Sequence, residues 1–196
     1  MDSNFFALIS RMRYIARWGL MRNALPENIQ EHSHMVAVLA HALGVIRRDI
    51  FHQPCDVNAL ATAALYHDAS EILTGDLPTP IKYHNAEIMS AYHAVEDLAV
   101  QKLLGMLPPE LRATYADVLA EDKGGDIYPL VKAADKLSAY IKCIEERKAG
   151  NNEFLSAEAQ TRAALEASPL PEVQYFLDHF IPAFERDLDE LGAIGQ

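Results

Sequence analysis

Apolar residues recur at spacings of three and four along almost the whole chain, and this pattern constrains the fold more than any other feature. Residues with this spacing line one face of an α-helix, whereas a half-buried strand needs an alternation of two, which is scarce here. One such series is Val36, Leu39, Ala40, Leu43 and Ile46. We find no internal repeat and no low-complexity linker. The sequence therefore predicts an all-α fold, a single-domain helical bundle over residues 1–196.

Capping and breaking residues divide this pattern into segments. Asn28, followed three residues later by Glu31, forms a capping box that predicts a helix from residue 29 to about 49. Asp56 is the expected cap of a helix that runs toward His67. Pro and Gly residues separate the other expected helices, which cover about 5–15, 86–106, 128–148, 153–167 and 172–191, with a short one before the Gly124-Gly125 loop.

Charge and composition exclude several classes of function. Charged residues interrupt every apolar run, so no stretch approaches the roughly 20 apolar residues that cross a bilayer. The net charge of −11 argues against a nucleic-acid polymer as partner, but a bound cation still allows a small phosphorylated substrate. The first residues lack the basic and apolar regions of a secretory signal, which predicts a cytoplasmic protein. Cys55 and Cys143 are too few for a disulfide framework.

Two histidines and two aspartates are the candidate metal ligands. Imidazole and carboxylate together suit a divalent first-row metal such as Co, Mn or Zn, and the sequence leaves its identity open. A His-Asp pair alone is weak evidence, since isolated histidines are commonly structural. Because we find no second set of ligands, we expect one metal. The four residues lie on three expected helices and are His32, His67, Asp68 and Asp135.

The segments around these residues resemble the HD-domain metal phosphohydrolases, and among them the bacterial 5'-deoxynucleotidases of the YfbR type. The resemblance implies an HD-type helical fold, one divalent metal, a homodimer, and hydrolysis of deoxyribonucleoside 5'-monophosphates to deoxyribonucleoside and phosphate. Each ligand position of the family holds the expected residue type. The matching segments keep the family's order over nearly the whole chain and are Arg17-Trp18, Glu27–Ser33, Tyr66–Glu71, Thr74–Pro80, Lys132–Asp135 and Ala149–Phe154.

Two acidic residues are the candidates for acid–base work. Metal coordination lowers the pKa of water from 15.7 toward roughly 7, so we expect a metal-activated water as nucleophile. In a continuous helix, Glu71 would share the face of His67 and Asp68, and we expect it to handle protons. The alternative is a surface glutamate. Asp76 is a second catalytic or sugar-binding candidate, although aspartate is also common in turns.

The resemblance makes Arg17 and Trp18 the substrate-binding pair. Arg17 would present a planar fork of donors, and Trp18 a rigid wall that selects against a 2'-hydroxyl. The alternatives are a surface arginine and a core tryptophan. Lys82 or Lys132 could assist phosphate binding, or each could be a solvated charge.

Two other functions stay open on the sequence. The same metal ligands would serve an HD-domain phosphohydrolase acting on another nucleotide, cyclic or polyphosphorylated, and a substrate panel separates these reactions. A non-catalytic helical interaction protein with a structural metal or none is the other possibility, because helical bundles host many functions. Phosphate release after metal reconstitution distinguishes it from an enzyme.

Overall fold

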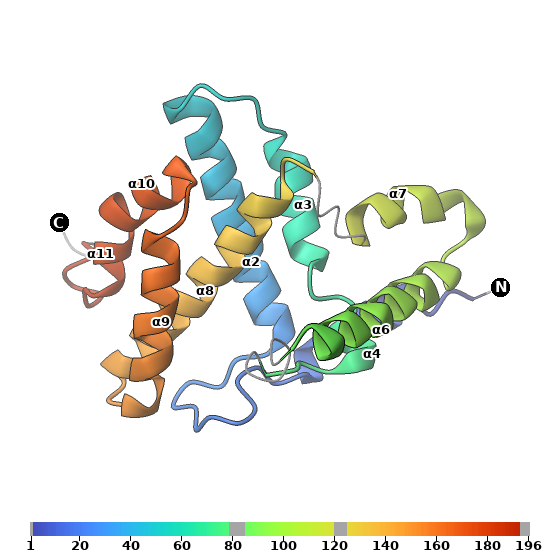
Figure 1. The fold of residues 1–196 in the computed structure, drawn as a ribbon, viewed down its shortest axis with the longest axis horizontal. Helices are drawn as coiled ribbons and strands as arrows, with labels where there is room; N and C mark the ends of the chain where they lie inside the picture. The colour runs from blue at the N-terminus through green and yellow to red at the C-terminus, as the bar shows by residue number, and fades with distance from the viewer. Residues whose placement is uncertain (1, 79–84, 120–124, 193–196) are drawn as a thin grey trace.

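A computed structural model describes residues 2–78, 85–119 and 125–192 (Figure 1). The described residues form helices and contain no β-strand; a single isolated bridge joins Ala16 to Asn28. The predicted all-α helical bundle is confirmed. None of the described helices is both long and apolar enough to span a membrane.

Three helices form the main core: α2 (Ile29–Val45), α3 (Val57–Tyr66) and α8 (Tyr128–Lys148). Figure 1 shows α2 in the middle of the molecule, and it packs against both α3 and α8. Burial of each large aliphatic side chain contributes roughly 1.5–3 kcal/mol, so this cluster is the main source of stability. Its fully buried members include Val36, Leu43, Leu60, Leu137 and Ile144.

The predicted caps fix where these core helices begin. Asn28 Oδ1 accepts hydrogen bonds from the amides of Gln30 and Glu31, both at 3.0 Å, and Glu31 Oε2 accepts from the Asn28 amide. Asp56 Oδ1 likewise accepts from the amide of Ala59 at 3.0 Å. The predicted capping box and the Asp56 cap are confirmed.

Close approach between α2 and α3 depends on Gly44. A Cβ at this position would lie 2.9 Å from Cδ2 of Leu60. Beyond it, α2 widens into the π-helical turn η2 (Ile46–Ile50) before the chain reverses toward Asp56. The helix expected over 29–49 is therefore an α-helix only to Val45 and a π-helical turn from Ile46.

The C-terminal helices cover one side of the core. After η3 (Asn152–Phe154), α9 (Leu155–Glu166) packs along α8, and α10 (Pro171–His179) and α11 (Ile181–Phe184) follow. The single helix expected over 172–191 is wrong. Pro182 lies in the first turn of α11, where its ring and missing amide interrupt the helix that precedes it.

The remaining helices form a smaller second core. It joins α1 (Phe5–Ile9) to α6 (Ala86–Gly105) and α7 (Pro109–Leu119), with α4 (Glu71–Thr74) against α6. The helix expected over 5–15 continues only as the tighter 3₁₀ turn η1 (Ser10–Tyr14). The buried members of this core are Phe5, Ala69, Leu103, Leu104, Leu107 and Leu119. Lys82, Gly124 and the Thr79-Pro80 part of the predicted turn lie outside the described residues.

Candidate metal centre

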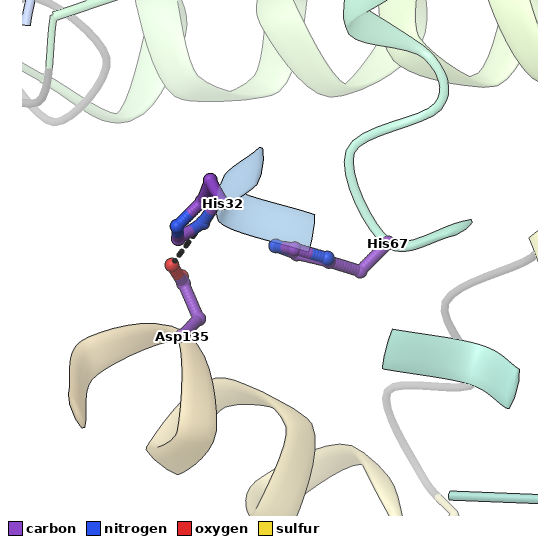
Figure 2. Close-up of side chains that lie close together, drawn as sticks. All are labelled: His32, His67 and Asp135. Atoms are coloured by element: carbon purple, nitrogen blue, oxygen red, sulfur yellow. Dashed lines mark ion pairs between the residues drawn. The ribbon is translucent and has the colours of Figure 1, made fainter. Parts of the chain in front are cut away.

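The structure brings the four predicted ligands together. His32 comes from α2, Asp135 from α8, and His67 and Asp68 from the turn that follows α3. His32 Nε2 lies 3.1 Å from Asp135 Oδ1 and 3.5 Å from Asp68 Oδ2, and His67 Nε2 lies 3.1 Å from Asp68 Oδ2. Figure 2 shows His32 directly above Asp135, with the His67 ring pointing toward this pair from the side; one ligand atom from each of these three lies within 4.8 Å of the others.

Hydrogen bonds orient both imidazoles. His67 Nδ1 lies 2.7 Å from the carbonyl oxygen of Ala64, which can only accept, so Nδ1 carries the proton and Nε2 presents a lone pair. His32 Nδ1 lies 3.1 Å from the hydroxyl of Ser138. Apart from the carboxylate oxygens of Asp68 and Asp135, neither buried Nε2 atom has a polar partner among the described residues. Two buried imidazole nitrogens beside two carboxylates fit a divalent cation.

The electrostatics of the site favour ionised carboxylates. Burial acts to raise the pKa of Asp68, but the neighbouring His67 and His32 lower it more, and the net pKa falls well below the ordinary value. The pKa of Asp135 is depressed in the same way, burial being outweighed by His32 and His67. Burial acts to lower the pKa of His67, and the two carboxylates raise it overall. Both carboxylates are therefore charged at neutral pH and available to a cation.

Tight turns replace the continuous helix expected around Glu71. The Ala69 amide bonds to the carbonyl of Tyr66 at 2.9 Å, and the Glu71 amide bonds to the carbonyl of Asp68 at 3.0 Å. Since α3 ends at Tyr66 and α4 begins at Glu71, the expectation of one helical face through these residues is wrong. Glu71 is nevertheless only 6% exposed, so it is not a surface glutamate.

Glu27 joins the two predicted substrate-binding residues. Its Oε2 accepts from Arg17 Nη1 at 2.7 Å and from Trp18 Nε1 at 3.2 Å. The Trp18 ring meets the buried Phe154 ring edge-on, with 5.3 Å between centroids. The Arg17 side chain is only 13% exposed, so it is not a surface arginine. Sequence reasoning missed this role of Glu27, because a partner ten residues away leaves no periodic signal.

The backbone at Trp18 adopts an unusual conformation. Its φ of 58° lies in the left-handed region, which a bulky side chain seldom enters. The flanking chain is held by hydrogen bonds from the Arg17 amide to the carbonyl of Glu27 and from the Ile29 amide to the carbonyl of Ile15, both at 3.0 Å. The backbone that leads into Trp18 is therefore fixed against residues 27–29.

Arg17, Trp18 and Asp76 line one cavity of about 650 Å³, a size suited to a small molecule. Burial acts to lower the pKa of Arg17, but the carboxylates of Glu27, Asp135 and Asp68 raise it overall, so two of the predicted metal ligands stabilise the charged guanidinium. Burial raises the pKa of Asp76, against the opposing effect of Arg17.

The Lys132 ammonium lies 5.5 Å from the centre of the Tyr128 ring.

This helical fold and its cluster of two histidines and two aspartates define a metal-dependent phosphohydrolase of the HD-domain class. An HD-domain phosphohydrolase from Listeria innocua shares the fold with a TM-score of 0.82, 24% identity, and coverage of 94% of this chain and 90% of that one. The HD phosphohydrolase of cyanophage S-2L, solved with dA and one catalytic Zn²⁺, gives a TM-score of 0.59 and 25% identity over 97% of this chain and 99% of that one.

The family model described as 5'-deoxynucleotidase YfbR-like matches residues 4–184. The curated 5'-deoxynucleotidases YfbR of Shigella flexneri and Escherichia coli are each 50% identical to the chain over 191 residues, which is 97% of this chain and 96% of theirs. The chain belongs to the YfbR-like 5'-deoxynucleotidase family and is a hydrolase. The predicted family is confirmed.

Proposed function

We propose that this chain hydrolyses deoxyribonucleoside 5'-monophosphates to deoxyribonucleosides and inorganic phosphate. The observation that carries the proposal is the convergence of His32, His67, Asp68 and Asp135 from three separate segments, with each imidazole Nε2 3.1 Å from a carboxylate oxygen. The names of the curated relatives support the substrate class. The dA in the cyanophage structure supports a deoxynucleoside beside such a site.

The four residues would hold one divalent cation, whose identity among Co, Mn and Zn is open. When bound, the cation supplies charge that stabilises the phosphoryl oxygens and makes water a sufficient nucleophile at neutral pH. The hydrogen bond between His67 and Ala64 keeps Nε2 of His67 turned toward the cation site. Depressed carboxyl pKa values keep Asp68 and Asp135 charged for the same purpose.

The other residues of the site would bind substrate and move protons. We assign phosphate and sugar binding to Arg17, discrimination against the 2'-hydroxyl to Trp18, and orientation of the sugar or water to Asp76. Glu71 takes a proton from the attacking water. The oxygen of that water bonds to phosphorus, the bond from phosphorus to the 5'-oxygen breaks, and the proton passes to the leaving 5'-oxygen.

Phosphate release tests this function. The chain is stripped with a chelator, reloaded with Co²⁺, Mn²⁺ or Zn²⁺, and given paired deoxyribo and ribo 5'-monophosphates together with cyclic and triphosphate nucleotides. We expect release that depends on metal and is greatest for the deoxyribo monophosphates. Faster release from a cyclic or polyphosphorylated nucleotide would favour another HD-domain activity. No release with any ion would favour a non-catalytic interaction protein.

We further propose that residues 1–196 fold as one domain, and that the chain works in the cytoplasm as a homodimer. The family resemblance supports the dimer. The long helix α6 also offers apolar side chains for such an interface, since Val95 is 49% exposed and Leu98 is 62% exposed. Light scattering after gel filtration should give twice the mass of 21.8 kDa. A monomeric mass at micromolar concentration would contradict the dimer.

A further inference from the structure

The cavity of about 650 Å³ has a second wall that the proposed reaction does not use. Arg17, Trp18 and Asp76 line one part of it, and helix α9 lines another. The residues from α9 recur at spacings of one, three and four, so they share one helical face. They are Ser156, Ala157, Gln160 and Thr161.

This wall suits an uncharged group. Among the described residues that line the cavity, Arg17 is the sole cation, and the acidic Glu153 is paired with Arg22 at 2.9 Å. None of the α9 residues that line the described part of the cavity is basic, so a second phosphate group would have no positive partner among them. The lining also includes the apolar side chains of Leu20, Met21 and Pro78, so the remaining space accepts a flat group with an apolar face and a polar edge.

Gln160 offers a defined hydrogen-bonding group on this wall. Its Nε2 donates to Ser156 Oγ at 3.0 Å, one helical turn earlier. That bond uses one of the two amide hydrogens and restrains the side chain. The carbonyl oxygen and the second N–H can still accept and donate side by side, which is the pattern that a glutamine uses to bind the edge of a nucleobase.

We propose that α9 forms the nucleobase subsite, in which Gln160, supported by Ser156, hydrogen-bonds the edge of the base. This inference rests on the proposed function, because it requires a nucleotide whose phosphate lies at the metal centre. Gln160 is thus a substrate-binding residue that acts on the base and has no part in the chemistry at phosphorus.

Removal of the base from the substrate tests the assignment. For Gln160→Leu we expect kcat/KM to fall roughly three- to tenfold on deoxyribonucleoside 5'-monophosphates, the size of one net hydrogen bond, with no change on 2-deoxyribose 5-phosphate. Inhibition by deoxyadenosine should weaken, while inhibition by inorganic phosphate stays the same. Gln53→Leu, at an exposed glutamine in the loop before α3, is the matched control and should change nothing.

A second substitution tests the space available for the base. Ala157→Leu should narrow the cavity and reduce kcat/KM more for purine than for pyrimidine deoxynucleotides. Ala159→Leu, at an exposed position of the same helix that does not line the cavity, should leave the ratio unchanged.

Equal losses on the nucleotides and on the base-free sugar phosphate would overturn the subsite, as would unchanged kinetics of both Gln160→Leu and Ala157→Leu. These failures differ from a failure of the proposed function, in which the unmodified chain would release no phosphate from any deoxynucleotide.

Discussion

Glu71 is only 6% exposed and follows His67 and Asp68 closely in the sequence, so it is the residue that we propose for proton transfer. Replacement of Glu71 by Gln keeps its shape and removes its capacity to exchange protons. We expect kcat to fall about 10²- to 10⁴-fold, as for the loss of a general acid or base. The measurement is steady-state phosphate release, with metal content determined by mass spectrometry.

The metal content of Glu71→Gln should equal that of the unmodified chain, because Glu71 is not among the four predicted ligands. Glu87→Gln, at an exposed position of α6, is the control for a change of charge alone. Unchanged turnover in Glu71→Gln would refute the role of Glu71 in proton transfer.

Glu27 holds Arg17 and Trp18 through a single oxygen, so its charge should set the orientation of both. Glu27→Gln should lower kcat/KM roughly ten- to a hundredfold, the range for loss of hydrogen bonds to a charged group. It should also reduce the preference for deoxyribo over ribo monophosphates, measured with paired substrates.

Glu158→Gln is the matched control for Glu27→Gln, because Glu158 also forms a shielded ion pair, with Arg147 at 2.9 Å, but does not line the cavity. A preference for deoxyribo substrates that is the same in Glu27→Gln and in the unmodified chain would show that Glu27 does not set selectivity.

At the scale of elements, Glu146 of α8 fastens the segment that follows Trp18. The buried carboxylate accepts hydrogen bonds from the amides of Ala24 at 2.8 Å and Leu25 at 3.0 Å, and from Asn151 Nδ2 at 2.7 Å. Lys142 also donates to it and to the carbonyl of Leu25. The loop that presents Arg17 and Trp18 is thereby tied to the core helix.

This network predicts a dependence of stability on pH. Burial acts to raise the pKa of Glu146, but the hydrogen bonds from Lys142, Ala24 and Asn151 lower it to about 2, from an ordinary value of 4.5. A carboxyl pKa that is lower in the folded chain than in the unfolded chain stabilises the folded state at pH values above the unfolded pKa. That contribution is lost as the pH falls from about 5 toward 2. Urea unfolding across this range should show the loss.

Glu146→Gln should be less stable at pH 7 by about 3–5 kcal/mol, since Lys142 is left buried without its charged partner. Its stability should also fall less steeply than that of the unmodified chain below pH 5. Glu166→Gln, which breaks an exposed pair with Arg162, should follow the unmodified chain. Parallel pH curves for Glu146→Gln and the unmodified chain would contradict this account.

Local signals explain why some elements could be predicted and others could not. The apolar spacing predicted the helix over 128–148 and most of the one expected over 29–49, and the Asn28 cap and Gly150, local signals close to helix ends, marked where they begin or end. The expected helix over 172–191 failed because the apolar pattern continues through Pro182, where the backbone cannot. The 3₁₀ turn at Ser10–Tyr14 likewise keeps a helical spacing while it changes the winding.

At the scale of the whole molecule, the metal would connect segments that are distant in sequence. The four ligands come from α2, the turn after α3, and α8, so a bound cation stabilises the folded state alone. At a concentration a hundredfold above its dissociation constant it contributes about 2.7 kcal/mol, which corresponds to roughly 5–10 °C in Tm for a chain of this size.

Calorimetry before and after chelation measures this difference. Asp135→Asn, which removes one ligand charge, should show a much smaller response to the chelator, and re-addition of metal should restore the Tm of the unmodified chain only. A Tm that does not respond to chelation would mean that the four residues hold no metal in the folded chain.

The sequence predicted which residues gather at the site better than it predicted the contacts around them. The four candidate ligands could be named from residue type and resemblance, and the structure gathers them. The bonds of Glu146 to Ala24 and Leu25, by contrast, span more than a hundred residues, and the α9 wall lies opposite a loop far from it in sequence. Such contacts depend on the packing of whole helices, which spacing within one helix does not encode.

The helices α2, α3 and α8 form the main core and also carry or directly precede the four polar side chains, so the packing of this core sets the geometry of the predicted metal centre. A cavity-forming change at Leu43 or Leu137, remote from any substrate, would loosen the same helices that set the distances between imidazole and carboxylate. Catalytic output and thermal resistance should therefore decline together in random variant libraries. Metal occupancy in such a library would measure the fraction of protein that keeps this core folded.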